Sequence, residues 1–588
     1  MCGIIGITGA HEGLIREAAK TFAYRGPDFS AVVSDGRVTL GHNRLSIIGL
    51  DPHANQPMAN ADDTLRIVFN GEIYNYKELR QELESLGHFC VTASDTEVLL
   101  HAYKAWGNAM VGRLRGMYAL ALYDRSAGAL VLMTDYANMK PLFYAQVGSV
   151  FMFASELKGV IAMLRGVGGK IAADEEALDI YWALGYVPVP RTIFHAVRRM
   201  PRRTVLTVDV ATGICTEHEY EKLSTHALTV EELQALIERK VQSHLVADVP
   251  VGLFFSGGTD SSLIASILTA RNIRIEAFSL ELMARPEDKA YFNAIAKHVA
   301  LSIRKRYFGI KEFDEIYPTV VAQIDEPFSD SSLFPMYFLS RMAAEHVKVV
   351  LTGDGGDEYF LGYPRSLVLS RMVGAPLDAE MTILDYLYIG TPRFRGKVRL
   401  FEKLFSFFRK PLSYYLLTVS PTKDLMRPRQ WRHAKRTLGS RNASPTSLDA
   451  EFYLENGILR KVDIATMYSS LEARMPLLDP EIVAAAEAGM PALLPLQSKK
   501  PLLKRMLATY LPSSLVYRGK RGFGLDAPVF FAASRYLERD YKSALAYLGE
   551  KRLIDLRRLP EATTLVRRRP SMLWQTLLLY HSLKNAGI

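Results

Sequence analysis

The chain has 588 residues, 49% of them hydrophobic, a length that predicts more than one domain. No stretch approaches the roughly 18 uncharged apolar residues of a membrane span, and the segment that begins Met1-Cys2-Gly3 lacks the basic start of a secretory signal. A net charge of +10 from scattered Lys and Arg favours a solvated basic surface over a nucleic-acid site, and three cysteines suggest no disulfide framework, so we expect a cytoplasmic protein.

Short strands with turn signals dominate the sequence from residue 2 to about 205. An apolar run at 2–8 predicts a strand, and runs at 118–123 and 130–133 flank a Ser-Ala-Gly turn and predict a hairpin. Helices are predicted at 76–86 and at 94–106, where Ser94-Asp95-Thr96-Glu97 has the pattern of a capping box. Many strands and few helices predict an α+β domain of antiparallel sheets layered with helices.

The pattern changes after about residue 210. A strand-like run at 251–255 leads through a Gly turn into a helix from Ser261, and a buried strand at 347–351 ends at a turn rich in Gly and Asp. Strands that alternate with helices predict an α/β domain with a parallel sheet, while the tail at 440–588 is expected to be mostly helical. We expect domains at 2–205 and 229–588, joined by a linker at 206–228.

Cys2 is the first residue whose position suggests chemistry. Removal of Met1 would leave Cys2 with a free α-amine beside its thiol, which places nucleophile and base in one residue. Taken alone, a small buried strand residue is the more common explanation of a cysteine here. The motifs that follow change this interpretation.

Six motifs come after Cys2 in order: Arg25-Gly26-Pro27-Asp28, His42-Asn43-Arg44-Leu45-Ser46-Ile47, Asn70-Gly71-Glu72-Ile73-Tyr74-Asn75, Ser94-Asp95-Thr96-Glu97, Lys140-Pro141-Leu142-Phe143-Tyr144 and Phe153-Ala154-Ser155-Glu156. With Cys2 they resemble the glutaminase domain of the class II, N-terminal nucleophile (Ntn) amidotransferases. The chain departs from that family at 134–141, which reads Thr-Asp-Tyr-Ala-Asn-Met-Lys-Pro and lacks two basic residues and a glycine. Domain contacts and ammonia transfer are the functions that this departure affects.

The resemblance implies roles for the matching residues. Cys2 would attack the amide carbon of glutamine, and the Asn70 side chain and the Gly71 N–H would form the oxyanion hole, each donor worth on the order of 3 kcal/mol.

The same resemblance implies how glutamine is held. Arg44 would bind its α-carboxylate with a planar pair of donors. Glu72 and Asp95 would bind its α-ammonium, beside Asn70 and Gly71. For Glu72 and Asp95 the alternatives are a turn at a strand end and a helix cap.

A phosphate loop is predicted in the second half. Ser256-Gly257-Gly258-Thr259-Asp260-Ser261-Ser262 joins a strand to a helix, so small residues and a helix N-terminus face the same point. The Gly-x-x-x-x-Gly-Lys-Ser/Thr pattern of phosphate-loop kinases is absent from the sequence. The segment instead resembles the pyrophosphate loop of enzymes that split ATP between the α and β phosphates.

A second turn, Leu351-Thr352-Gly353-Asp354-Gly355-Gly356-Asp357-Glu358, also follows a strand and offers carboxylates that suit Mg²⁺. Three further motifs are Asp325-Glu326-Pro327-Phe328, Leu471-Glu472-Ala473-Arg474-Met475-Pro476-Leu477-Leu478-Asp479 and Lys520-Arg521-Gly522-Phe523-Gly524. In this order they resemble the synthetase (ATP-pyrophosphatase) domain of glutamine-hydrolysing asparagine synthetases, over about 230–535.

This second resemblance implies Asp260 and Asp357 as ligands of Mg²⁺, Lys500 as the cation that neutralises the leaving pyrophosphate, and Asp354 as the base that deprotonates ammonia. Many relatives have Glu at the position of Asp354. The residues implied in ATP binding are Phe255, Ser256, Gly257, Gly258, Asp260, Ser261, Ser262, Leu280, Thr352 and Gly353.

Together the two halves predict an ATP-dependent glutamine amidotransferase. ATP would activate a carboxylate as an acyl-adenylate, and ammonia from glutamine would attack it through an internal tunnel. Aspartate is the expected acceptor and asparagine the expected product, with AMP and diphosphate. The predicted partners are small molecules, namely glutamine, ATP and aspartate or another carboxylate, with no nucleic acid and no membrane span, and the chain could form a homodimer.

Two alternatives stay open. A paralogue with the same loops could amidate another acid, such as a sugar uronate of surface polysaccharides, and the segment at 365–455, rich in aromatic and basic residues, could reshape its acceptor pocket. The intact glutaminase motifs weigh against ring-closing relatives, which need no ammonia. A non-catalytic scaffold protein is the second alternative, although loss of Cys2 or Asp260 would have been its signature.

Overall fold

The computed structural model describes residues 2–282, 286–390, 398–422, 426–440, 443–489, 499–517, 524–554, 566–567 and 570–588. The motif segment 520–523 and part of the segment 365–455 lie outside these residues. Within them, no helix combines the length and the apolar character that a membrane crossing needs.

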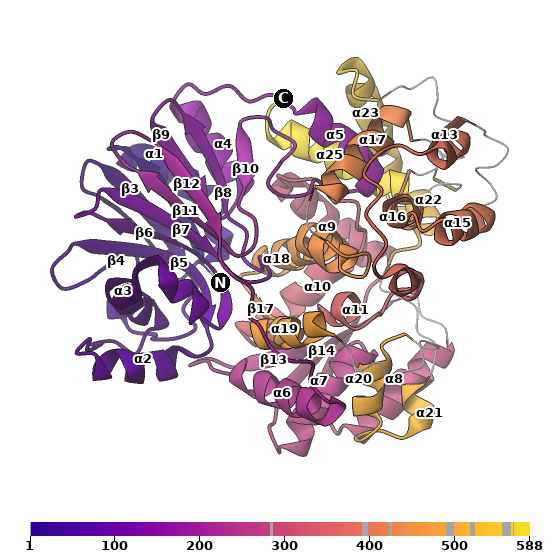
Figure 1. Ribbon diagram of the computed structural model, residues 1–588, viewed down its shortest axis with the longest axis horizontal. Helices are drawn as coiled ribbons and strands as arrows, with labels where there is room; N and C mark the ends of the chain where they lie inside the picture. Colours follow the sequence, from indigo (N-terminus) through magenta and orange to yellow (C-terminus); the bar gives the residue numbers. More distant parts are fainter. Residues whose placement is uncertain are drawn as a thin grey trace.

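The first half is built from two six-stranded antiparallel sheets (Figure 1). The first sheet has the order β10 (Val197–Arg199), β8 (Phe143–Val147), β9 (Val150–Ala154), β1 (Gly3–Thr8), β3 (Val38–Arg44) and β2 (Phe29–Ser34). The second sheet has the order β12 (Cys215–Glu219), β11 (Thr204–Asp209), β7 (Ala129–Thr134), β6 (Gly116–Asp124), β5 (Leu65–Ile73) and β4 (Met58–Ala59). The predicted strand at 2–8 and the hairpin at 118–133 are confirmed as β1 and as the β6–β7 pair.

The two sheets pack face to face and each is covered by helices on its outer face, which gives a domain of four layers. In β1, Ile4 belongs to the core between the sheets, whereas Ile5 and Ile7 pack with α1 (Glu12–Lys20) and α4 (Leu157–Gly166) on the outer face. Helices α2 (Tyr76–Ser85) and α3 (Asp95–Trp106) cover the outer face of the second sheet. Side chains along a strand point alternately to the two faces of its sheet. Apolar residues on both faces therefore let each sheet pack against the other sheet on one side and against helices on the other. This helix–sheet–sheet–helix order confirms the predicted α+β class.

The two predicted helices form where the sequence places them, but the cap differs from the expected box. The side chain of Ser94 accepts a hydrogen bond from Thr96 N, as an N-cap does. The carboxylate of Glu97 turns away from Ser94 and accepts from the backbone of Val91 at 2.9 Å and of Thr92 at 2.6 Å. The capping-box prediction is therefore wrong in its second half, because Glu97 binds the incoming loop instead.

The second half contains a five-stranded parallel sheet in the order β15 (Ser302–Tyr307), β14 (Glu276–Glu281), β13 (Val251–Phe254), β16 (Val349–Leu351) and β17 (Glu472–Arg474). Strand β17 lies in the tail that was expected to be mostly helical, and two of its three residues are charged, so no apolar run indicates a strand there. Because β13 and β16 are neighbours with the same direction, the loops that follow them meet at one edge of the sheet.

Helices surround this sheet and fill the C-terminal part (Figure 1). Those along the sheet are α6 (Val230–Ser243), α7 (Thr259–Ala270), α8 (Pro286–His298), α9 (Ile310–Gln323) and α10 (Leu333–Ala344). The others are α11 (Gly356–Tyr359), α12 (Pro364–Leu369), α13 (Ile383–Gly390), α15 (Val398–Phe407), α16 (Pro411–Val419), α17 (Pro428–Gly439), the π-helical segment η5 (Asp449–Ile458), α18 (Leu459–Met467), α19 (Pro480–Ala488), α20 (Pro501–Leu507), α21 (Ser513–Val516), α22 (Ala527–Ala533), α23 (Leu537–Glu550) and α25 (Pro570–Asn585).

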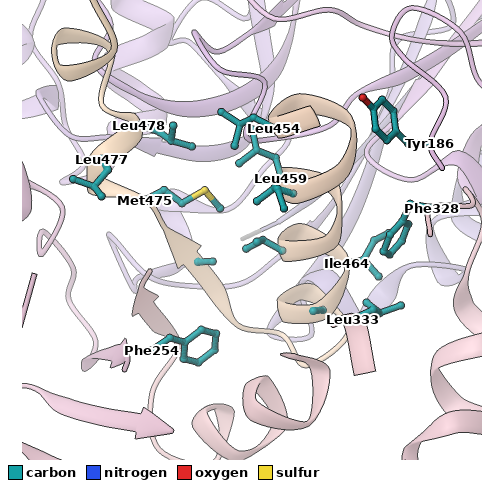
Figure 2. Packing of buried hydrophobic residues seen from close by; sticks show 14 of the residues in the cluster. Tyr186, Phe254, Phe328, Leu333, Leu454, Leu459, Ile464, Met475, Leu477 and Leu478 are labelled. Atoms are coloured by element: carbon teal, nitrogen blue, oxygen red, sulfur yellow. The ribbon is translucent and has the colours of Figure 1, made fainter. Parts of the chain in front are cut away.

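One buried cluster joins these helices to the sheet. Figure 2 shows Leu459 and Ile464 of α18 among the apolar residues that pack near β17, with Met475 and Leu478 just beyond the strand. Helix α18 is therefore buried in the interior of the second half, close to the strand that runs beside β16.

The connection between the halves is shorter than a linker of 206–228 would be. Strand β11 pairs with β7, and β12 pairs with β11, so both extend the second antiparallel sheet. Part of the expected linker therefore lies in a β-sheet, while the domain limits themselves stay a prediction.

Candidate active sites

The first site is centred on Cys2, which directly precedes β1. The backbone nitrogen of Cys2 donates to Asn70 Oδ1 at 3.0 Å, and its Sγ lies 3.8 Å from the carbonyl oxygen of Leu45. Burial raises the pKa of the Cys2 thiol. Asn70 is fully buried, and its Nδ2 has no hydrogen-bond partner within the described part of the chain. A thiol and an amide donor that lies unused beside it suit an acyl-transfer site.

Gly71 lies in β5 opposite Tyr118 of β6. A Cβ atom here would lie 2.1 Å from the carbonyl oxygen of Met117, so only glycine permits this close backbone approach. The close packing explains why a glycine stands beside Asn70, whether or not its N–H also binds a ligand.

The guanidinium of Arg44 is bound to the loop that follows β3. It donates to the carbonyl oxygen of Asp51 at 3.2 Å and to Asn55 Oδ1 at 2.6 Å, and also to Gly49 O. Burial lowers the pKa of Arg44. In the structure Arg44 therefore holds a loop beside Cys2, and any carboxylate that it binds must share it with these acceptors.

Two buried carboxylates complete the first site. Asp95 Oδ2 accepts from Ile73 N at 3.2 Å, and burial raises the pKa of Asp95 to about 7. Glu72 is 2% exposed and receives a hydrogen bond from Arg474 of β17 at 2.8 Å. Burial raises the pKa of Glu72 even with this guanidinium beside it. The sequence motifs placed Glu72 in the site but gave no sign that its partner comes from the second half.

The second site is a cavity of about 610 Å³ at the carboxyl ends of β13 and β16. It brings together most of the predicted ATP and metal residues, namely Phe255, Ser256, Gly258, Asp260, Ser261, Leu280, Thr352, Gly353, Asp354, Asp357 and Lys500. Gly257 and Ser262 are not among the lining residues, and Ser262 is fully buried in α7. A phosphate contact of Ser262 therefore stays a prediction.

Glycines allow the two loops to touch. Gly257 has φ +64, a conformation that favours glycine, and turns the chain into α7. A Cβ on Gly353 would lie 2.7 Å from the Cβ of Asp260, and one on Gly356 would lie 2.5 Å from Asp260 Oδ1. The second loop therefore lies directly against the Asp260 carboxylate.

Lys500 lies between the two predicted metal ligands. Its Nζ pairs with Asp260 and lies 2.9 Å from Asp357 Oδ2. Burial alone would lower the pKa of Lys500, but the two carboxylates outweigh it and raise the pKa. The carboxylates are thus placed to share one cation, and hard oxygen ligands are those that Mg²⁺ accepts. No cluster of three or more His, Cys, Asp or Glu residues suited to a metal occurs among the described residues, so phosphate or water would complete such a site.

The cavity also contains charged residues to which the sequence motifs assigned no role. Burial raises the pKa of Glu358 to about 8, and Glu358 accepts from the Tyr363 hydroxyl at 2.7 Å. Lys461 of α18 forms an ion pair with Asp330 at 3.1 Å, and both line the cavity. The signal that could have found Lys461 is a run of charges inside an otherwise apolar helix, which indicates buried ion pairs.

A buried network of charges lies between the two sites. Arg25 Nε donates to the carbonyl oxygen of Cys2 at 3.1 Å, and the same guanidinium pairs with Glu156 at 2.5 Å and with Asp463 of α18 at 2.9 Å. Arg460, one turn earlier on α18, pairs with Asp325 at 3.2 Å and with Glu326 at 3.1 Å. These groups are almost completely buried, so each charge depends on its partners.

The stretch at 134–141, where the motifs depart from the amidotransferase pattern, contributes to this contact between the halves. Asn138 donates through its Nδ2 to Met200 O and to Glu455 Oε1, both at 2.9 Å. Lys140 is fully buried, and burial lowers its pKa to about 8.

Comparison with known proteins assigns each half to a family model. Residues 1–221 match the model of a glutamine amidotransferase domain, and residues 232–582 match the asparagine synthase model.

Relatives match most of the chain. A Mycobacterium tuberculosis protein is 33% identical over 92% of this chain and 90% of its own length. Asparagine synthetase [glutamine-hydrolyzing] 1 of Bacillus subtilis is 30% identical over 89% of the chain and 87% of its own length. Asparagine synthetase B [glutamine-hydrolyzing] of Escherichia coli is 29% identical over 62% of the chain and 65% of its own length.

Proposed function

Because the chain belongs to the family of glutamine-hydrolysing asparagine synthetases, ligases that take their amide nitrogen from glutamine, we propose that it converts aspartate, glutamine and ATP to asparagine, glutamate, AMP and diphosphate. Glutamine-dependent amidation follows from the family. Aspartate as the acceptor is the finer part of the proposal, since paralogues could amidate other acids.

In the first site, Cys2 attacks the amide carbon of glutamine. Its α-amine, exposed once Met1 is removed, accepts the thiol proton, which offsets the burial that otherwise raises the thiol pKa. Asn70 Nδ2, which has no other partner among the described residues, and the N–H of Gly71 stabilise the oxyanion. Arg44 takes the α-carboxylate, while Asp95 and Glu72 take the α-ammonium.

In the second site, the loop at 256–261 binds the phosphates of ATP through backbone N–H groups and the N-terminus of α7. Asp260 and Asp357 would hold Mg²⁺, which supplies charge neutralisation of the phosphates when bound. Lys500 turns from these carboxylates toward the departing diphosphate. Asp354, held by the Thr352 hydroxyl at 2.7 Å, accepts the proton as ammonia attacks the acyl-adenylate.

One observation carries the proposal. Two loops from neighbouring parallel strands bring Asp260, Asp354 and Asp357 into one cavity, where Lys500, at the start of α20, joins them, and a separate thiol site lies in the other half of the chain. In this proposal the carboxylate is activated in the cavity of the second half, and ammonia is released from glutamine at the thiol site of the first half, as a glutamine-dependent ligase requires.

The substitution Cys2→Ala tests this division. We expect the variant to lose glutamine-driven asparagine formation and to keep amidation driven by added ammonium salts, because the second site is left intact. Mass spectrometry of the product and AMP release are the measurements. Loss of both activities in a folded variant would show that the sites do not divide the work in this way, and release of ADP and phosphate would contradict the adenylate step.

Binding of Mg²⁺, a cytosolic location, a homodimeric assembly and the domain limits stay predictions from the sequence. The dependence of AMP release on added Mg²⁺ after chelation tests the first of these.

A further inference from the structure

Two charged residues in the wall of the ATP cavity have no role in the chemistry described so far. Asp330 precedes α10, and Lys461 lies in α18, so they come from elements other than the two phosphate loops. Both line the same cavity as Asp354 and Lys500. They are therefore placed where a second substrate could reach them while ATP occupies the loops.

The geometry holds the two charges in fixed positions. Asp330 Oδ1 accepts from the N–H of Ser332 at 2.9 Å and from its hydroxyl at 2.7 Å, while Oδ2 accepts from Lys461 Nζ at 3.1 Å. The side chain of Asp330 is 28% exposed and that of Lys461 is 11% exposed. One of the three ammonium donors of Lys461 is used in the contacts that the structure describes, so donors are left for a ligand.

The surroundings of both groups favour their charged forms. Burial pushes the pKa of Asp330 upward, but Lys461 and the hydrogen bonds of Ser332 outweigh it and lower the pKa. Burial pushes the pKa of Lys461 downward, but Asp330 and then Asp354 outweigh it and raise the pKa. Lys461 and the proposed base Asp354 line the same cavity.

We propose that Lys461 binds the α-carboxylate and Asp330 the α-ammonium of the acceptor, and that the acceptor is consequently a free amino dicarboxylic acid rather than a uronate. The inference rests on the proposed function and deepens it. A fixed pair of opposite charges in a partly buried cavity wall is complementary to the ammonium and carboxylate of an amino acid. An acid without an amine offers no positive charge to the Asp330 carboxylate and should therefore bind less tightly.

A neighbouring cavity sharpens the proposal. This second cavity, of about 340 Å³, is also lined by Asp330 and Tyr453, which stand between the two spaces. A substituent on the amino group of the acceptor would extend toward Asp330 and this space. Acylation would remove the positive charge that pairs with Asp330, so this carboxylate, and not a lack of space, distinguishes a free amine from an acylated one.

The first experiment compares acids with the wild-type protein, with ammonium salts as the nitrogen source so that the glutaminase site plays no part. We expect AMP release with aspartate, and a kcat/KM at least about tenfold lower with succinate, N-acetylaspartate and glucuronate. Equal or better use of glucuronate, succinate or N-acetylaspartate would overturn the inference yet leave ATP-dependent amidation standing. Absence of AMP release with every acid would instead refute the proposed function, and the inference with it.

The second experiment uses Asp330→Asn and Lys461→Met. The asparagine keeps an oxygen for the Ser332 bonds and removes the charge. We expect each variant to raise the KM for aspartate about tenfold or more and to leave the KM for ATP within about twofold, because a lost charged hydrogen bond acts on the acceptor alone. Lys461→Arg should restore part of the aspartate affinity.

The matched control is Glu345→Gln, which removes a 2.7 Å ion pair with Arg306 on the exposed surface. It should leave both KM values unchanged. If the variants at 330 and 461 bind ATP normally and keep the wild-type KM for aspartate, the pair is structural and the inference is wrong.

Discussion

Asp95 shows how burial shifts the pKa of a single residue that is proposed to bind glutamine. Its pKa is raised to about 7 from an ordinary value of 3.8, chiefly by burial. Between these values the folded protein binds a proton that the unfolded chain releases, so the free energy of unfolding falls as the pH rises from about 4 to 7. Ionised Asp95 thus lowers the stability of the folded protein at neutral pH, and it supplies the anion that the proposed glutamine site needs.

The pH dependence of glutamine binding follows from this residue. Since only the ionised carboxylate attracts an ammonium, we expect the KM for glutamine to fall as the pH rises through about 7, by up to about tenfold per unit below it. Asp95→Asn should have a high KM without this slope. Glutaminase kinetics across this pH range measure both, and Asp209→Asn, at the exposed end of β11, is the control. A wild-type KM that is constant with pH would contradict the assignment of Asp95.

At the scale of elements, α18 is the helix on which both halves depend. Its Asp463 pairs with Arg25, which also holds the carbonyl of Cys2, while Arg460 binds carboxylates that follow α9. All three charges are buried in the contact between the halves. The helix therefore connects the position of Cys2 to the packing of the second half.

Asp463→Asn tests this contact. Removal of one partner leaves Arg25 buried with less compensation, and we expect a loss of about 3–5 kcal/mol in the free energy of unfolding. Urea titration followed by fluorescence measures it. Glu538→Gln, which removes an exposed pair with Lys542, should cost under about 1 kcal/mol. Equal losses in the two variants would show that the network at Arg25 contributes no more than a surface pair.

At the scale of the whole molecule, Arg474 touches both sites. Its carbonyl oxygen accepts from Thr352 N, at the ATP cavity, and its guanidinium donates to Glu72, in the glutamine site, both at 2.8 Å. The residue lies in β17, so the sheet of the second half supports a carboxylate of the first. This contact ties the geometry of one pocket to that of the other.

Arg474→Met should affect the two activities unequally. The backbone bond to Thr352 remains, whereas Glu72 loses the guanidinium that favours its ionised form, so we expect the KM for glutamine to rise at least tenfold while ammonia-driven amidation falls less. The ratio of the two activities is the measurement. Arg271→Met, which removes a surface pair with Glu238, is the control. A parallel fall in both activities would indicate a general loss of structure instead.

The sequence predicted what depends on local pattern. The sequence predicted the strands before Ser256 and Thr352 and the glycine-rich turns after them. Each of these features depends on residues within a few positions of one another, such as an apolar run, turn-forming glycines or the first residues of a helix. Contacts such as Arg474 with Glu72 or Lys461 with Asp330 join residues far apart in the chain, and no local pattern records them. Strand β17 was missed because its sequence, Glu472-Ala473-Arg474, is not an apolar run, unlike that of the equally short β16.

The arrangement of α18 limits how the specificity of the enzyme can be re-engineered. Lys461 faces the acceptor cavity, but Arg460 and Asp463, within the same turn, anchor the two halves to each other. Replacing α18 with the helix of a paralogue would therefore change both the residue that faces the acceptor and the ion pairs that hold the two halves together. Substitutions confined to positions 330 and 461 would change fewer residues than exchange of the helix and would leave the ion pairs between the two halves intact.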